Sequence, residues 1–325
     1  MSFRTTSRTT FRNTTFRSTT PADLDRVLSC TVDEPVSWAD PERYRGMLES
    51  GAYRPEHTWI AEDDEGRLLA RAVWWTFPEG DRPLALDCVW TAPGAEDRTA
   101  LAAGLLAAAH DSFRTAGWEL PEWHLFLAPD WREDPAVSAA LAWRREAAAR
   151  SSLGGSLERY RYAWTPGAPV PAASGRLVFT AEPDDEVFVE LFRRTAEGSI
   201  DDDTVRGLAR LGEEGQARET LEAYLQMPGE RSWWLTAHTP EGEPVGFALP
   251  SANQGGPVVG FLGVLPAMRG RGYVDELLGE ITRFHAARGA ERIGADTDAD
   301  NLPMAAAFDR AGYHRFGVRL VLTTG

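Results

Sequence analysis

The chain has 325 residues, of which 34 are basic and 49 acidic, so its formal net charge is −15. This acidic balance disfavours nucleic acid or an anionic membrane as a partner, because both require a basic protein surface. All 34 basic residues are arginine. Without lysine, the chain can form neither a P-loop nor a lysine-bound pyridoxal phosphate site.

The cysteines and histidines form no disulfide framework and no metal-binding pattern. Cys30 and Cys88 are expected to be reduced thiols in a core. The six histidines are scattered without ligand spacing, so we predict no metal site. No apolar run approaches the roughly 18 residues of a membrane span, and the first twenty residues lack the apolar segment of a secretory signal. We therefore expect a cytoplasmic protein whose residues 1–15 form a disordered tail.

One pattern of elements is predicted twice along the chain. In the first half, a short strand from Phe16 leads into a helix that opens at Pro21. In the second half, Leu177–Phe192 repeats that design. A hairpin with a Gly-containing turn then follows in each half, at 58–74 and at 233–248.

A third strand and a long helix come next in both halves, the strands being Leu84–Trp90 and Val258–Val264. The second half continues with a strand at Glu291–Thr297, a short helix and a final alternating strand. This order predicts a mixed α/β fold with a mostly antiparallel sheet flanked by helices. A Pro/Ala/Gly-rich segment lies between the halves, so we expect a first domain at 16–165, a linker at 166–175 and a second domain at 176–325.

The turn that follows the strand at 258–264 has the composition of an anion site. Pro266 ends the strand, and Gly270 and Gly272 permit tight backbone angles and close approach of a ligand. An amphipathic helix starts at once, so its free N–H groups and the positive end of its dipole meet at this turn. Arg269 and Arg271 add positive charge. Such a turn suits a pyrophosphate, although Asp275 excludes the dinucleotide-binding pattern G-x-G-x-x-G.

This turn resembles motif A of the GNAT acetyltransferase superfamily, V-x-P-x-x-[RQ]-G-x-G-x-[GA]. Val264, Pro266, Arg269, Gly270 and Gly272 match the motif, whereas its last position is Val274. The stretch from Asn301 to Tyr313 resembles motif B of the same family. The whole chain then resembles a tandem GNAT protein whose N-terminal copy is degenerate.

The resemblance implies acetyl-CoA as the acyl donor. Its pyrophosphate would lie on the N–H groups of Gly270, Arg271, Gly272, Tyr273 and Val274, with Arg269 nearby. Its pantetheine arm would pair with the backbone of Leu262, Gly263 and Val264, and Asn301 and Phe308 would line the cofactor site. A main-chain N–H near Val264 would polarise the thioester carbonyl, an effect worth about 3–4 kcal/mol where a single donor has been removed.

The general acid of many relatives is missing. They carry a tyrosine seven residues after the motif B asparagine, where this chain has Phe308. Tyr273 and Tyr313 are the possible substitutes. For the proton of the attacking amine, the candidate bases are Asp202, in the cluster between the first two helices of the second half, and Asp296, at the end of a strand.

The corresponding turn of the first half has lost both motif glycines. Alignment of the following helices places Asp97 opposite Arg269 and Ala100 opposite Gly272. An acidic residue there would repel phosphate, so this half is interpreted as a degenerate copy.

The expected function is therefore transfer of an acyl group from acetyl-CoA to a primary amine of a small molecule by direct attack. A catalytically silent CoA-binding sensor, which Phe308 favours, and a peptide or protein N-acetyltransferase remain as alternatives. The sequence identifies neither the acceptor amine nor the oligomeric state.

Overall fold

A computed structural model describes residues 14–31, 34–36, 39–253 and 255–324. The chain divides into two compact units, Met1–Glu158 with Arg319–Gly325, and Arg159–Val318. The first boundary lies before the predicted linker at 166–175, so most of strand β6 (Gly155–Trp164) belongs to the second unit. The predicted disordered tail falls outside the described residues except for Thr14 and Thr15, which begin strand β1.

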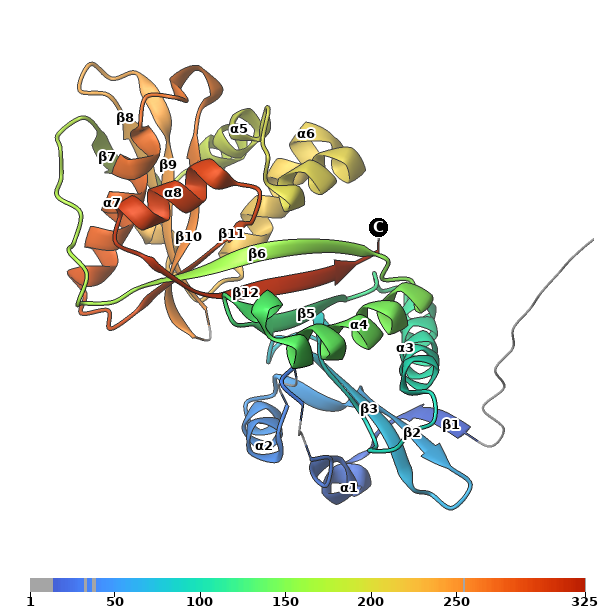
Figure 1. The fold of residues 1–325 in the computed structure, drawn as a ribbon. Coiled ribbons are helices and arrows are strands. Elements are labelled where there is room, and N and C mark those ends of the chain that lie inside the picture. The colour runs from blue at the N-terminus through green and yellow to red at the C-terminus, as the bar shows by residue number, and fades with distance from the viewer. Residues whose placement is uncertain (1–13, 32–33, 37–38, 254, 325) are drawn as a thin grey trace, which may run out of the picture. The chain divides into compact units, whose positions relative to one another are not determined.

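The first unit contains the elements predicted for its half of the chain in the predicted order, together with a second helix, a fifth strand and a final helix that were not predicted (Figure 1). Its strands are β1 (Thr14–Ser18), β2 (Tyr53–Asp63), β3 (Leu68–Trp75), β4 (Ala85–Thr91) and β5 (Glu122–Leu127). They follow one another in the sheet in that order, and only β4 and β5 pair in parallel. Its helices are α1 (Leu24–Leu28), α2 (Pro41–Glu49), α3 (Arg98–Thr115) and α4 (Pro135–Arg150).

The second unit repeats this order. Its further strands are β7 (Val178–Ala181), β8 (Leu235–His238), β9 (Pro244–Asn253), β10 (Gly256–Val264), β11 (Ile293–Asp298) and β12 (His314–Thr323), which continues into the first unit. Its helices are α5 (Asp185–Ala196), α6 (Asp202–Leu225), α7 (Tyr273–Ala286) and α8 (Leu302–Arg310). Neighbouring strands run in the order β6-β11-β10-β9-β8-β7, with β10 and β11 the parallel pair.

Two apolar cores cover opposite faces of the second sheet. On one face, α7 and α8 contribute Leu277, Leu278 and Phe308, which pack with Val245 of β9 and Ile293 of β11.

On the other face, α5 and α6 contribute Phe188, Phe192 and Leu221, which pack against Phe247 and Leu249 of β9. The predicted mixed, mostly antiparallel sheet flanked by helices is thereby confirmed. None of the described helices is both long enough and apolar enough to pass through a bilayer.

Candidate active site

The parallel strands β10 and β11 separate toward their C-terminal ends. They are paired at Val258 and Gly294, whereas β10 continues to pair with β9 as far as Val264 opposite Gly246. A register shift between Val258 and Phe261 marks an irregularity in β10, and Gly260 there has a φ of +71°. Beyond Val258, the edge of β10 that faces β11 therefore has no strand partner among the described residues. Leu262, Gly263 and Val264, for which backbone contacts with the pantetheine arm were predicted, lie on this stretch of β10.

The turn between β10 and α7 presents free backbone donors. Gly270 and Gly272 both have a φ of +76°, and Gly272 is the N-cap of α7 without a side-chain cap. In the described part of the chain, no acceptor is found for the N–H groups of residues 270–274. A Cβ atom at Gly270 would meet nothing within 4 Å, so there is room above the turn. These donors and the helix dipole form an anion site.

Arg269 uses its guanidinium within the protein. Its Nη2 donates to the carbonyl of Thr195 at 2.7 Å and its Nη1 to that of Glu197 at 2.7 Å. Its Nε donates to the carbonyl of Val264 at 3.2 Å. Arg269 therefore connects the end of β10 to the end of α5. The exposed Arg271, by contrast, donates only a 3.2 Å bond to Ala267 among the described residues.

The start of α7 is held by Arg176. Its guanidinium lies 4.8 Å from the centre of the Tyr273 ring, and its Nη2 donates to the carbonyl of Arg271 at 2.7 Å. Val274 is half-buried and packs against the core below α7. The side chains of Tyr273 and Val274 thus fix the turn while their N–H groups stay available.

Position 308 offers no hydroxyl group. Phe308 is 2% exposed and its ring stacks on Tyr162 with centroids 4.9 Å apart. The hydroxyl of Tyr313 lies 2.9 Å from the Thr282 hydroxyl, and burial raises the pKa of Tyr313 well above its usual range. Tyr313 is therefore a poor proton donor. Asn301 caps α8, because its Oδ1 accepts a 3.2 Å bond from the backbone N–H of Met304.

Acidic side chains gather where β11 ends and α6 begins. The two predicted bases are both ion-paired: Asp202 lies 2.7 Å from Arg206 Nε, and Asp296 lies 3.7 Å from Arg161 Nε. The backbone N–H of Asp202 donates at 2.7 Å to Oδ2 of Asp298, which is 3% exposed. Asp298 thus attaches the start of α6 to the end of β11.

Arg159 completes this cluster and was missed by the sequence analysis. Its Nε lies 2.9 Å from Asp298 Oδ1 and its Nη2 lies 2.6 Å from Asp203 Oδ2. Burial raises the pKa of Asp298. The sequence does contain a signal for this pairing, because arginines alternate along β6 and aspartates alternate along β11. Arg159 and Arg161 lie opposite Asp298 and Asp296 in the register of these two strands.

Within the described residues, no group of three or more His, Cys, Asp or Glu side chains is arranged to hold a metal ion. The fold and the family match given next support an enzyme of the N-acetyltransferase class. Residues 200–313 match the model of the Acetyltransferase (GNAT) family. This match identifies a GNAT domain at residues 200–313. No curated protein sequence matches the chain.

Solved structures share the fold over nearly the whole chain. The GCN5-related N-acetyltransferase of Sphaerobacter thermophilus is 16% identical, with a TM-score of 0.56 over 95% of this chain and 94% of that one. A tandem GNAT protein from the clavulanic acid biosynthesis pathway is also 16% identical, with a TM-score of 0.50 over 96% of this chain and 99% of that one. At these identities the likeness establishes the fold, tandem arrangement included.

Proposed function

We propose that the chain transfers an acyl group from acetyl-CoA to a primary amine of a small molecule by direct attack. The observation that supports this most is the open edge of β10 followed by the uncapped turn at 270–274. The open edge supplies strand-like backbone partners for the pantetheine amides, and the turn supplies N–H donors for the pyrophosphate.

In this proposal, the backbone near Val264 polarises the thioester carbonyl, because the N–H group is fixed in a strand and needs no reorganisation. Asp296 and Asp202 are the candidate acceptors of the amine proton, directly or through water. Phe308 provides no proton for the departing thiolate. A thiol has an ordinary pKa of about 8.5, so it leaves without a general acid, at a cost in rate.

The test is calorimetric titration of the full chain with acetyl-CoA. Wild type should bind one equivalent at this site, and Gly272→Asp should abolish binding because it strains the turn and adds an acid beside the pyrophosphate. Gly289→Asp is the matched control. Gly289 has a φ of +77° with nothing within 4 Å of its Cβ position, but lies past the other end of α7. Equal binding by both variants would refute the site.

A second candidate function is a CoA-binding sensor without turnover, which the buried Phe308 favours. Binding of acetyl-CoA with no acetylation of any amine in a broad screen would support the sensor. Turnover of an amine that Asp296→Asn or Asp202→Asn lowers would support the enzyme. Unchanged kcat/KM in both variants would remove these two residues as bases.

A further inference from the structure

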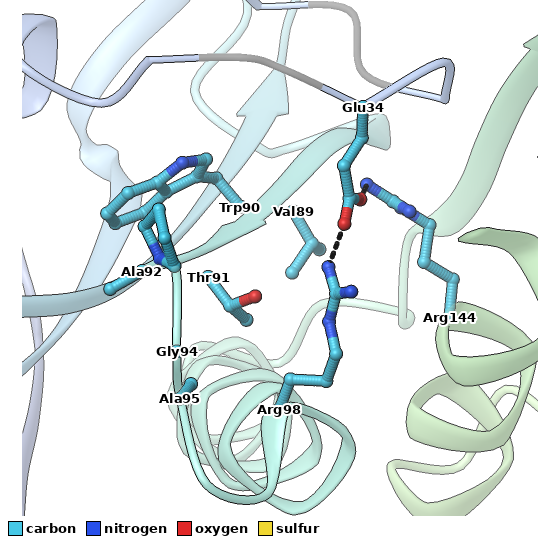
Figure 2. Close-up of a pocket in the computed structure, with 10 residues that line it drawn as sticks. Glu34, Val89, Trp90, Thr91, Ala92, Gly94, Ala95, Arg98 and Arg144 are labelled. Atoms are coloured by element: carbon cyan, nitrogen blue, oxygen red, sulfur yellow. Dashed lines mark hydrogen bonds and ion pairs between the residues drawn. The ribbon is translucent and has the colours of Figure 1, made fainter. Parts of the chain in front are cut away.

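The first unit contains a cavity of about 260 Å³ at the turn between β4 and α3. Residues 89–95 form one side of it, and Glu34, Arg98 and Arg144 form the other (Figure 2). All of these residues belong to the first unit, so the cavity is independent of the candidate acetyl-CoA site.

The strands of the first unit explain why there is room here. β4 and β5 pair in parallel at Ala85 with Glu122 and at Leu86 with Trp123, whereas β4 continues to Thr91. Past Leu86, the described residues show no further pairing between these two strands. The cavity adjoins the C-terminal end of β4, and this end of parallel strands is where α/β sheets commonly bind ligands.

Two guanidinium groups at this cavity hold one carboxylate between them. Arg98 bonds to Oε1 of Glu34, and Arg144 Nη2 lies 2.7 Å from Oε2 of the same carboxylate (Figure 2). Both guanidiniums lie 4.3 Å from the centre of the Trp143 ring, and Arg144 Nη1 also donates to the carbonyl of Ala140 at 2.9 Å. Arg144 is 2% exposed. The pair is therefore fixed in position by its surroundings.

Positive charge exceeds negative charge in this cluster, because two guanidiniums face one carboxylate. The Nε of Arg98 is buried without a hydrogen-bond partner among the described residues. Figure 2 shows the Thr91 hydroxyl on the side of Arg98. The N-terminus of α3 is already capped, since Asp97 accepts a 2.9 Å bond from the N–H of Ala100. The side chains, and not the helix end, thus give the cavity its preference for an anion.

We propose that this cavity binds a small monocarboxylate, whose carboxylate takes the place of Glu34 between Arg98 and Arg144. The two guanidiniums already hold the two coplanar oxygens of such a group, one each. The apolar body of the ligand would lie along Trp90 and the turn at 92–95, which form the opposite wall (Figure 2). The volume limits the ligand to a small molecule.

The test is calorimetric titration of the full chain with benzoate, and with benzamide as its neutral isostere. Benzoate should bind and benzamide should bind at least about tenfold more weakly. Arg98→Gln should weaken benzoate binding by about ten- to a hundredfold, because it removes a charged hydrogen-bond donor. Glu34→Gln should strengthen binding, because the internal competitor loses its charge.

Arg114→Gln is the matched control, since Arg114 is a paired residue near the other end of the same helix. It should bind benzoate as wild type does. If Arg98→Gln does not fold, Arg98→Lys replaces it, with an intermediate loss expected because lysine keeps the charge but not the planar fork.

The proposal fails if benzoate binds neither wild type nor Glu34→Gln, or if the Arg98 variants bind it unchanged. Tighter binding of inorganic phosphate than of benzoate, lost in Arg98→Gln, would overturn the assignment to a carboxylate. None of these results would bear on acetyl-CoA binding by the second unit.

Discussion

The guanidinium of Arg269 donates to the backbone carbonyl of Glu197 at 2.7 Å. Arg269 lies in the turn after β10, and Glu197 is the C-cap of α5. The same guanidinium reaches the carbonyls of Thr195 and Val264. The residue that the motif places beside the pyrophosphate thus also holds the end of α5 and the start of the following loop. The conformation of the α5–α6 loop and that of the candidate donor site are therefore coupled through one side chain.

We expect Arg269→Gln to loosen the loop at 197–201. Each lost bond to a charged donor costs about 1.5–3 kcal/mol, offset in part by the exposure of Arg269. Amide hydrogen exchange at 196–203 should become about tenfold faster or more. Arg271→Gln is the matched control, because Arg271 has the same charge two residues away but makes a single long bond within the described chain. Equal acceleration in both variants would contradict the coupling.

Gly260 allows β10 to separate from β11. Its φ is +71°, and a Cβ atom there would lie 2.2 Å from the carbonyl oxygen of Leu249 in β9. Gly260→Ala should therefore lower the free energy of unfolding by about 2–4 kcal/mol, because the backbone is strained and β9 is displaced. Acetyl-CoA affinity should fall as well, because the edge at Leu262–Val264 would move. Urea unfolding and calorimetry measure the two effects.

Comparison with Gly256→Ala separates the effect of backbone strain from the effect of displacing β9. Gly256 also has a positive φ, +101°, but its Cβ position has nothing within 4 Å. Its substitution should lower the free energy of unfolding by about 1–2 kcal/mol through backbone strain alone, and should leave acetyl-CoA affinity unchanged. If Gly260→Ala binds acetyl-CoA as well as Gly256→Ala does, the irregularity in β10 is not required for the site.

The order of elements and the turn at 266–274 could be predicted from the sequence, because both depend on local patterns. Pro266, Gly270 and Gly272 act through backbone angles and helix initiation, which neighbouring residues determine. The predicted helices and strands of the second half occur in the predicted order. β10 and β11 begin two residues from their predicted starts, whereas β9 runs to Asn253, five residues beyond the predicted hairpin.

The partners of charged side chains could not be predicted, because they depend on strand register and on contacts far apart in sequence. Arg159 meets Asp298 across β6 and β11, and Arg269 meets Glu197 from another element. The cavity at Arg98 could not be predicted either, because the residues that line it lie far apart in the sequence. Asp97 was taken as the charge at that turn, whereas it caps α3 and the facing charge includes Arg144 from α4.

Asp298 should matter more for stability than Asp296. Asp298 is 3% exposed, lies 2.9 Å from Arg159 Nε, and accepts the N–H of Asp202. Asp298→Ala removes the buried carboxylate that pairs with the partly buried guanidinium of Arg159, and should lower the free energy of unfolding by about 3 kcal/mol. Asp296→Ala, at a more exposed pair, should cost at most about 1 kcal/mol. Urea unfolding of both variants tests this order, and a loss of equal size would show that the cluster is not held by Asp298.

Buried histidines should make the protein less stable in mild acid. Burial lowers the pKa of His57, His110 and His285, so the folded chain keeps them neutral. On unfolding, each returns to an ordinary pKa of about 6.5 and takes up a proton at lower pH. Because the unfolded state then binds more protons, the free energy of unfolding should fall as the pH drops below about 6.5 and stay level above it.

His285 tests this reasoning within the second unit. Its Nε2 lies 2.9 Å from the carbonyl oxygen of Val258, the residue at which β10 pairs with β11. In His285→Gln, the amide can donate the same bond but cannot titrate. The slope of unfolding free energy against pH should therefore fall by up to about 1.4 kcal/mol per pH unit below the ordinary histidine pKa. His314→Gln, at an exposed position, is the matched control. If the slope of His285→Gln equals that of wild type, another group is responsible for the acid sensitivity.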